Sequence, residues 1–198
     1  PRGDSKMLDT CIAFDDWIAD TCVVDEEGMP LRVYRGEHGD THLPVHSRLA
    51  SISFGTREAA NAYATNPNDT YDCAQNPRVM AAYLSIRKPL INNPNDPFID
   101  FPILASAIGA ENARNVFVKF GDYLYNTDNW ASNFEMYESV DQVPLNEMDG
   151  LYLDLYPLLD DPSVVALLKA NGFDGAIHAG AGRTAREPEY KVFSADQI

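Results

Sequence analysis

The sequence has little of several features that would fix its class. Its 198 residues include only three cysteines, so no disulfide framework is expected and a reducing site of action is favoured. No hydrophobic run reaches the roughly 20 residues that a membrane-spanning helix needs. Basic residues are scarce: 15 Lys and Arg stand against 30 Asp and Glu, a formal net charge of −15. Because nucleic-acid affinity rests largely on Lys and Arg neutralising phosphates, this charge argues against a nucleic-acid substrate.

The rest of the amino-acid composition is typical of one soluble globular domain. Hydrophobic residues make up 45% of the chain, which at this size is enough to bury about 70% of the unfolded surface. The chain begins at Pro1 without an initiator Met or a signal-peptide pattern, which predicts a piece trimmed from a longer protein. We expect a monomer whose acidic surface attracts a partner with a basic face.

Periodicity and turn residues predict a mixed order of helices and strands. Residues 1–28 are expected to form an N-terminal helical cap, with its helix running from Ser5 to about Cys22, and residues 29–198 the main domain. Within that domain, about 98–161 is expected to be a helical insertion whose aromatic side chains are mostly core, with a target-recognition surface as the alternative. The further expected elements are strands near 31–36, 50–55, 79–86 and 173–178, helices near 57–65 and 162–171, and a final strand that begins at Glu189.

Three segments that lie far apart in the sequence carry candidate chemistry. In Val33-Tyr34-Arg35-Gly36 a short strand ends at a glycine, which lets backbone approach a ligand closely and leaves Arg35 at the strand end. In Ser51-Ile52-Ser53-Phe54-Gly55-Thr56, hydroxyl and apolar side chains alternate, so one strand face is polar. In Glu187-Pro188-Glu189-Tyr190 two carboxylates stand at the mouth of the last strand.

In this order, the three segments resemble the ADP-ribosyltransferase superfamily. The resemblance implies an α+β fold, a split β-sandwich with flanking helices. In the Arg-Ser-Glu type of mono-ADP-ribosyltransferase, a strand-end Arg, a Ser on the next core strand and a Glu on a late strand converge on NAD, and here Arg35, Ser53 and Glu189 match them. Tyr34-Arg35-Gly36 is also similar to the poly(ADP-ribose) polymerase core, in which His takes the place of Arg35.

The resemblance also implies a role for each residue of the site. Arg35 would bind the dinucleotide phosphates, Gly36 would offer backbone groups to the nicotinamide amide, and Ser53 would orient Glu189, with Ser51 as the alternative motif serine. The same NAD site would include Phe54 and Tyr63, whereas Glu187 and Arg186, in the loop before the last strand, would meet the acceptor. NAD+ is the co-substrate and no metal is expected, because Gly39 and Pro44 favour a loop over a helix that would align His38, His42 and His46.

The chemistry of this reaction calls for these residue types. Breaking the nicotinamide glycosidic bond builds positive charge on the ribose, and a fixed carboxylate such as Glu189 stabilises that charge. The alternative is a purely structural role, in which Arg35 and Glu189 form a buried ion pair. Under that reading Ser53 is an ordinary strand serine and Glu187 a solvated loop charge.

The resemblance predicts an NAD-dependent mono-ADP-ribosyltransferase that modifies a protein side chain. Glu187 makes arginine the first acceptor to consider, and a Ser or Thr hydroxyl, such as a threonine of ubiquitin, follows closely. By class analogy, the domain would belong to a bacterial effector or toxin that acts in the host cytosol. The alternatives are an NAD glycohydrolase toxin and a catalytically silent domain that binds NAD or protein.

Overall fold

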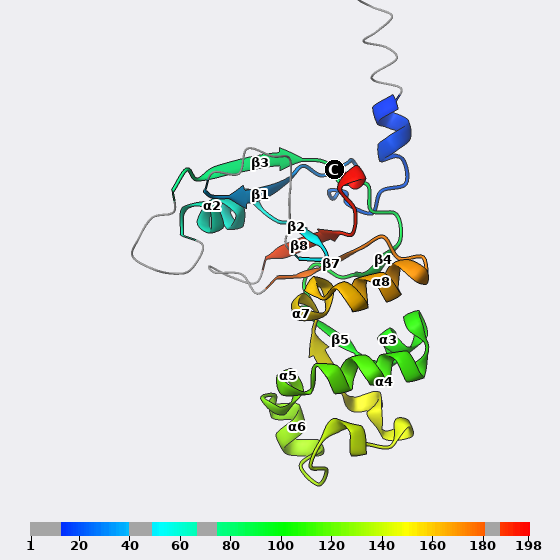
Figure 1. Ribbon diagram of the computed structural model, residues 1–198. Helices are drawn as coiled ribbons and strands as arrows, with labels where there is room; N and C mark the ends of the chain where they lie inside the picture. The colour runs from blue at the N-terminus through cyan, green and yellow to red at the C-terminus, as the bar shows by residue number, and fades with distance from the viewer. Residues whose placement is uncertain (1–12, 40–48, 67–74, 181–186) are drawn as a thin grey trace, which may run out of the picture.

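The computed structural model describes residues 13–39, 49–66, 75–180 and 187–198, and its fold is mixed α+β (Figure 1). The described strands form three small sheets. In the first, β1 (Val33–Glu37) pairs antiparallel with β3 (Arg78–Ala82). The second has the order β2-β8-β7-β4, formed by Ile52–Phe54, Pro188–Val192, Gly175–Ala179 and Pro89–Asn92. In the third, β5 (Phe98–Asp100) pairs antiparallel with β6 (Tyr152–Asp154).

The first two sheets face each other across a small apolar core. Alternate residues of β2 and β8 point into it, because side chains of a strand alternate between faces. A backbone bridge joins the sheets at one edge, where Tyr34 and Gly55 exchange hydrogen bonds of 2.9 and 2.8 Å. The buried members of this core are Val23, Val33, Ile52, Phe54, Leu84, Ile86, Ile177, Tyr190 and Val192. The opposite face of β8, which carries Glu189 and Lys191, is therefore turned away from this core.

Helix α2 (Arg57–Thr65) packs directly on β1. Thr56 caps its N-terminus by accepting a hydrogen bond from the Ala59 amide at 3.1 Å. The contact requires a glycine on the strand: a methyl group on Gly36 would overlap the carbonyl oxygen of Ala60 and come within 2.9 Å of the Ala64 nitrogen. Small residues on both elements thus let α2 pack closely against β1, next to Arg35.

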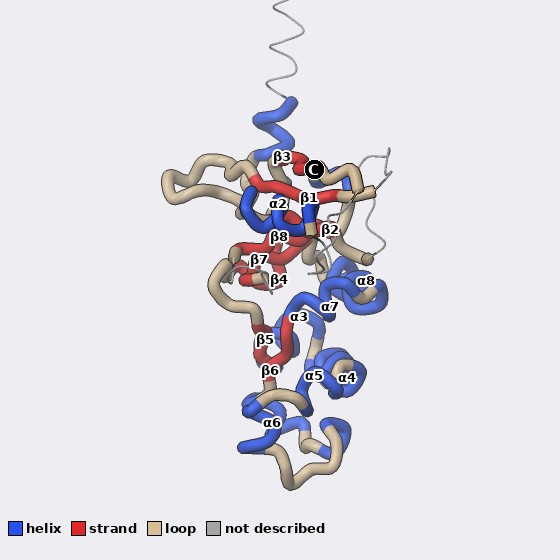
Figure 2. Tube along the Cα trace, turned by 90° about the vertical axis from the view of Figure 1, so that its left-hand side faces the viewer, coloured by secondary structure: helices blue, strands red, loops and turns tan. Residues whose placement is uncertain are grey.

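A helical lobe follows β4 and extends away from the β1-β3 sheet and the four-stranded sheet (Figures 1 and 2). It contains α3 (Phe101–Ile108), α4 (Ala110–Lys119), α5 (Gly121–Tyr125), α6 (Asp128–Asn133), two 3-10 turns (Val140–Gln142 and Leu145–Gly150) and α7 (Leu155–Asp160). Helix α8 (Pro162–Ala170) follows, and a third 3-10 turn (Ala195–Gln197) ends the chain. Because the lobe and α8 share one large apolar cluster with Leu90, Ala176 and Phe193, the lobe is anchored to the four-stranded sheet.

Several sequence expectations are confirmed and others are corrected. The helices expected near 57–65 and 162–171 are α2 and α8. The N-terminal helix does not reach Cys22: its described part covers residues 13–18 and ends before Asp20, whose φ is 62°. The strand expected over 79–86 ends at Ala82, and Pro89 opens a separate strand, as a proline can where no ladder N–H is needed. None of the helices in the described ranges is long and apolar enough to span a membrane.

Candidate functional site

A cleft of about 370 Å³ lies between β1, α2 and the adjoining ends of β2 and β8. Its size falls in the usual range for small-molecule sites, roughly 300–1,000 Å³. The lining comprises Tyr34, Arg35, Gly36, Leu49, Ser53, Phe54, Gly55, Ala59, Ala60, Tyr63, Gly180, Glu187, Pro188 and Glu189. The cleft therefore brings together residues from all three candidate segments of the sequence.

Arg35 stands on β1 with a mostly covered side chain. Its Nη1 donates a hydrogen bond to the carbonyl oxygen of Ser53 at 3.0 Å, which ties β1 to β2. Its Nε lies 3.5 Å from Glu37 Oε1, and this buried nitrogen makes no hydrogen bond. Glu37 also accepts from Arg78 Nε at 2.7 Å. The guanidinium is thus held at the cleft by a strand carbonyl and a carboxylate, with further N–H donors in its fixed fork.

The two candidate serines occupy different places. Ser53 lines the cleft and stands opposite Lys191 in the β2–β8 register. Ser51 is 1% exposed, is not part of the cleft lining, and its hydroxyl donates to Asp160 Oδ1 at 3.4 Å. Of the two, Ser53 is the serine that shares the cleft with Glu189.

Glu189 is the second residue of β8, and its side chain is 22% exposed at the cleft wall. Its Oε1 lies 3.5 Å from Lys191 Nζ. On the other side stands Gly180, where an added methyl group would come within 2.7 Å of Glu189 Oε2. Arg35 thus pairs with Glu37, and Glu189 with Lys191. The ion pair between Arg35 and Glu189, which the sequence left open as the structural alternative, is not formed.

Glu187 also lines the cleft. Its Oε2 accepts a short hydrogen bond from Thr56 Oγ1, the same hydroxyl that caps α2. Its carbonyl oxygen accepts from the Gly180 amide at 2.8 Å, one residue beyond the paired ends of β7 and β8. Both carboxylates of the last segment therefore face the cleft from one short stretch of chain. Arg186, predicted to meet the acceptor, lies outside the described residues.

The remaining predicted residues also border the cleft. Phe54 is buried and forms part of the core beneath it, and Tyr63 on α2 is exposed, with its ring centroid 5.6 Å from that of His38. Gly36 is in the lining as well, but its lack of a side chain is already required by the contact with Ala60.

Sequence reasoning missed His178, a fully buried residue that pairs with Glu189 in the β7–β8 register. Its Nδ1 lies 2.8 Å from the Ala179 carbonyl oxygen, which can only accept, so Nδ1 carries the proton. Its Nε2 is buried without a hydrogen-bond partner. Burial lowers the pKa of His178 below its ordinary 6.5, and the negative charge of Glu189 opposes this shift. A neutral imidazole therefore lies beside the carboxylate, on the same face of the sheet.

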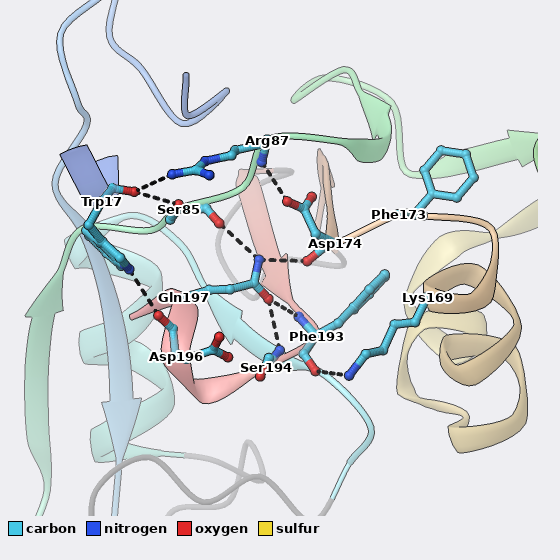
Figure 3. A pocket seen from close by; sticks show the side chains of 11 residues that line it. Trp17, Ser85, Arg87, Lys169, Phe173, Asp174, Phe193, Ser194, Asp196 and Gln197 are labelled. Atoms are coloured by element: carbon cyan, nitrogen blue, oxygen red, sulfur yellow. Dashed lines mark hydrogen bonds between the residues drawn. The ribbon is translucent and has the colours of Figure 1, made fainter. Parts of the chain in front are cut away.

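A larger hollow of about 690 Å³ lies where Trp17, the segment between β3 and β4, the end of α8 and the C-terminal turn meet (Figure 3). Its polar groups bind one another. The Gln197 amide donates to the carbonyls of Ser85 and Asp174 at 3.0 and 2.9 Å, and its oxygen accepts from the amides of Phe193 and Ser194 at 3.1 and 2.9 Å. This network holds the C-terminal turn in place, and the hollow contains none of the predicted site residues.

No group of three or more His, Cys, Asp or Glu side chains arranged to hold a metal occurs among the described residues. Comparison of the chain with protein-family models, with curated proteins and with solved structures finds no match. The functional argument therefore rests on the geometry of the cleft.

Proposed function

We propose that the chain is an NAD-dependent mono-ADP-ribosyltransferase that modifies a protein side chain, with NAD+ bound in the 370 Å³ cleft. The observation that carries the proposal is the meeting of Arg35, Ser53 and Glu189, from three different strands, in this one cleft. In the same proposal, the facing sheets β1-β3 and β2-β8-β7-β4 are the two halves of an ADP-ribosyltransferase split sandwich.

The residues present fit the chemistry of NAD. A planar guanidinium with several donors suits the dinucleotide phosphates, and Arg35 offers one at the cleft wall. The exposed ring of Tyr63 and the backbone around Gly36 offer an aromatic face and peptide groups to the nicotinamide ring. Glu189 supplies a carboxylate that is partly covered but still reaches the cleft.

In the proposed reaction, the bond between the nicotinamide nitrogen and the ribose breaks and its electron pair leaves with nicotinamide. Positive charge grows on the ribose, and Glu189 stabilises it as a fixed anion in a partly desolvated site. The acceptor atom then bonds to the ribose and loses its proton. Glu187 is placed at the same cleft by its hydrogen bond to Thr56, where it would bind an arginine acceptor or receive a proton from a hydroxyl.

The acceptor protein in this proposal has a basic face, which the net charge of −15 supports. Ubiquitin is one small protein with such a face. A bacterial effector or toxin acting in a host cytosol is the setting that we propose for this activity, on class analogy alone.

The test combines labelled NAD+ with purified protein and with eukaryotic or bacterial lysates. Glu189→Gln should remove protein labelling and nicotinamide release, with about a 10²–10³-fold loss of rate, as for other electrostatic contacts of this kind. Glu111→Gln, an exposed carboxylate on α4, is the matched control and should behave as wild type. Nicotinamide release without labelled protein would replace the transferase by a glycohydrolase. Identical behaviour of the Glu189 variant and wild type would refute the proposed site.

A further inference from the structure

Lys191 is a buried cation directly behind the candidate catalytic carboxylate. It lies two residues after Glu189 on β8, so the two side chains share one face of the sheet. Its side chain is 2% exposed, and the strand register places it between Ser53 on β2 and Ala176 on β7. An ammonium buried this deeply must be paired, because an unpaired charge in an apolar interior is strongly unfavourable.

Asp160 is the strong partner of this ammonium. The Lys191 Nζ to Asp160 Oδ1 distance is 2.6 Å, the length of a charge-assisted hydrogen bond. Asp160 is the last residue of α7, and two neighbours fix it: Ser51 donates to its carboxylate at 3.4 Å, and the Ala50 amide donates to its carbonyl at 3.3 Å. The cation is therefore held in place from the helical lobe.

Glu189 is the weak partner. Its Oε1 lies 3.5 Å from Lys191 Nζ, a distance at which charges attract without a short hydrogen bond. The other oxygen, Oε2, lies against Gly180, where no side chain stands in its way. The carboxylate thus lies between the Lys191 charge and the backbone of Gly180, at the wall of the cleft.

The charges of this cluster leave Glu189 as its excess anion. Asp160 and Lys191 compensate each other, and burial keeps His178 neutral, so within this cluster the negative charge of Glu189 is the uncompensated one. Without the lysine, the Asp160 carboxylate from α7 and the Glu189 carboxylate on β8 would have no cation between them and would repel each other.

We infer that Lys191, fixed by Asp160, is a positioning residue that holds the Glu189 carboxylate at the cleft for stabilising charge on the NAD ribose. The inference rests on the proposed function. It gives the helical lobe a part in the site, because α7 supplies Asp160.

The test measures nicotinamide release and NAD+ affinity separately. In Lys191→Met, which keeps the length of the side chain, kcat should fall about 10–100-fold because a carboxylate misplaced by ~1 Å can cost about 10²-fold. The Kd for NAD+ should stay within about threefold of wild type. The double variant Lys191→Met/Asp160→Asn leaves neither charge unpaired, so it is the better-folded form and should show the same loss of kcat.

The matched control is Lys119→Met, which removes an exposed lysine paired at 2.6 Å with Asp161, the neighbour of Asp160. It should leave kcat and the Kd for NAD+ unchanged. A purely structural role for Lys191 would lower the melting temperature but would not lower kcat in the folded double variant.

The outcomes separate this inference from the proposed function. A wild-type protein that releases no nicotinamide refutes the proposed function. An active wild type whose folded double variant keeps its full kcat refutes the role of Lys191 alone. A crystal structure of the double variant gives a readout independent of activity: the Glu189 carboxylate should move from the cleft wall, and an unmoved carboxylate overturns the inference.

Discussion

Gly180→Ala should impair the site without destabilising the fold. Among the described residues, the new methyl group would come within 2.7 Å of Glu189 Oε2, 3.3 Å of Glu189 Cβ and 3.5 Å of the Glu187 carbonyl oxygen. The closest of these atoms is the end of a flexible side chain, so it can retreat. To reach the 3.0–3.4 Å range of tight contacts, Oε2 must move by about 0.3–0.7 Å.

The expected magnitudes follow from this displacement. Turning the Glu189 side chain off its rotamer costs about 0.5–1.5 kcal/mol, and the loss of glycine freedom in the unfolded chain returns about 0.4–1 kcal/mol. The free energy of unfolding should therefore change by less than about 1 kcal/mol. Because a misplacement of ~1 Å can cost about 10²-fold in rate, a shift of roughly half that distance predicts about a tenfold lower kcat for nicotinamide release.

The assay pairs urea denaturation with initial rates of nicotinamide release from NAD+. Gly150→Ala is the control, since a methyl group at this position in the helical lobe meets Phe134 at an ordinary 3.4 Å. Full activity in the Gly180 variant would show that the carboxylate has room that the structure does not give it. Lost activity together with a loss of several kcal/mol in stability would place the effect in the fold and refute the reasoning.

Three further predictions concern stability. Gly36→Ala should lower the free energy of unfolding by at least about 2 kcal/mol, because its methyl group overlaps the rigid backbone of α2; denaturant melts that match wild type would contradict this. Burial lowers the pKa of His178 below 6.5, so the free energy of unfolding should fall as the pH drops below 6.5, by at most about 1.4 kcal/mol per pH unit. In His178→Gln, the melting temperature should therefore depend less on pH between 6.5 and 5.5 than it does in wild type. Burial disfavours the charge on Asp161, but hydrogen bonds from Lys119, Ser163 and the Val164 amide outweigh this effect and lower its pKa from 3.8 to about 2. Asp161→Ala should therefore lower the free energy of unfolding by about 1 kcal/mol above pH 4. The difference in stability between wild type and variant should narrow as the pH falls toward 2, and a constant difference would count against this prediction.

The sequence predicts best the elements whose signals are local. The cap at Thr56 and the small residues that follow it indicate α2, and the Asp161-Pro162 start indicates α8. Short strands are harder, because their residues are placed by partners far along the chain. Pro89–Asn92 was missed for this reason: its parallel partner is β7, more than 80 residues later, and its proline reads as a stop.

The same limit applies to the site. Arg35, Ser53 and Glu189 stand in recognisable segments, and the structure brings them to one cleft. Asp160 and His178 carry no such signal, because one ends a helix and the other lies in the middle of a buried strand. Their relevance comes only from distance and register: 2.6 Å to Lys191 for Asp160, and the strand position opposite Glu189 for His178.

The helical lobe is more than an appendage to the sheets, because its last helix reaches the back of the site. Ser51, which the resemblance offered as a second motif serine, contacts Asp160 rather than the cleft, and Asp160 in turn contacts Lys191. A change in how α7 packs on the sheet would therefore reach Glu189 through two ion pairs, Asp160–Lys191 and Lys191–Glu189. The helical lobe therefore contributes to the environment of Glu189 through Asp160.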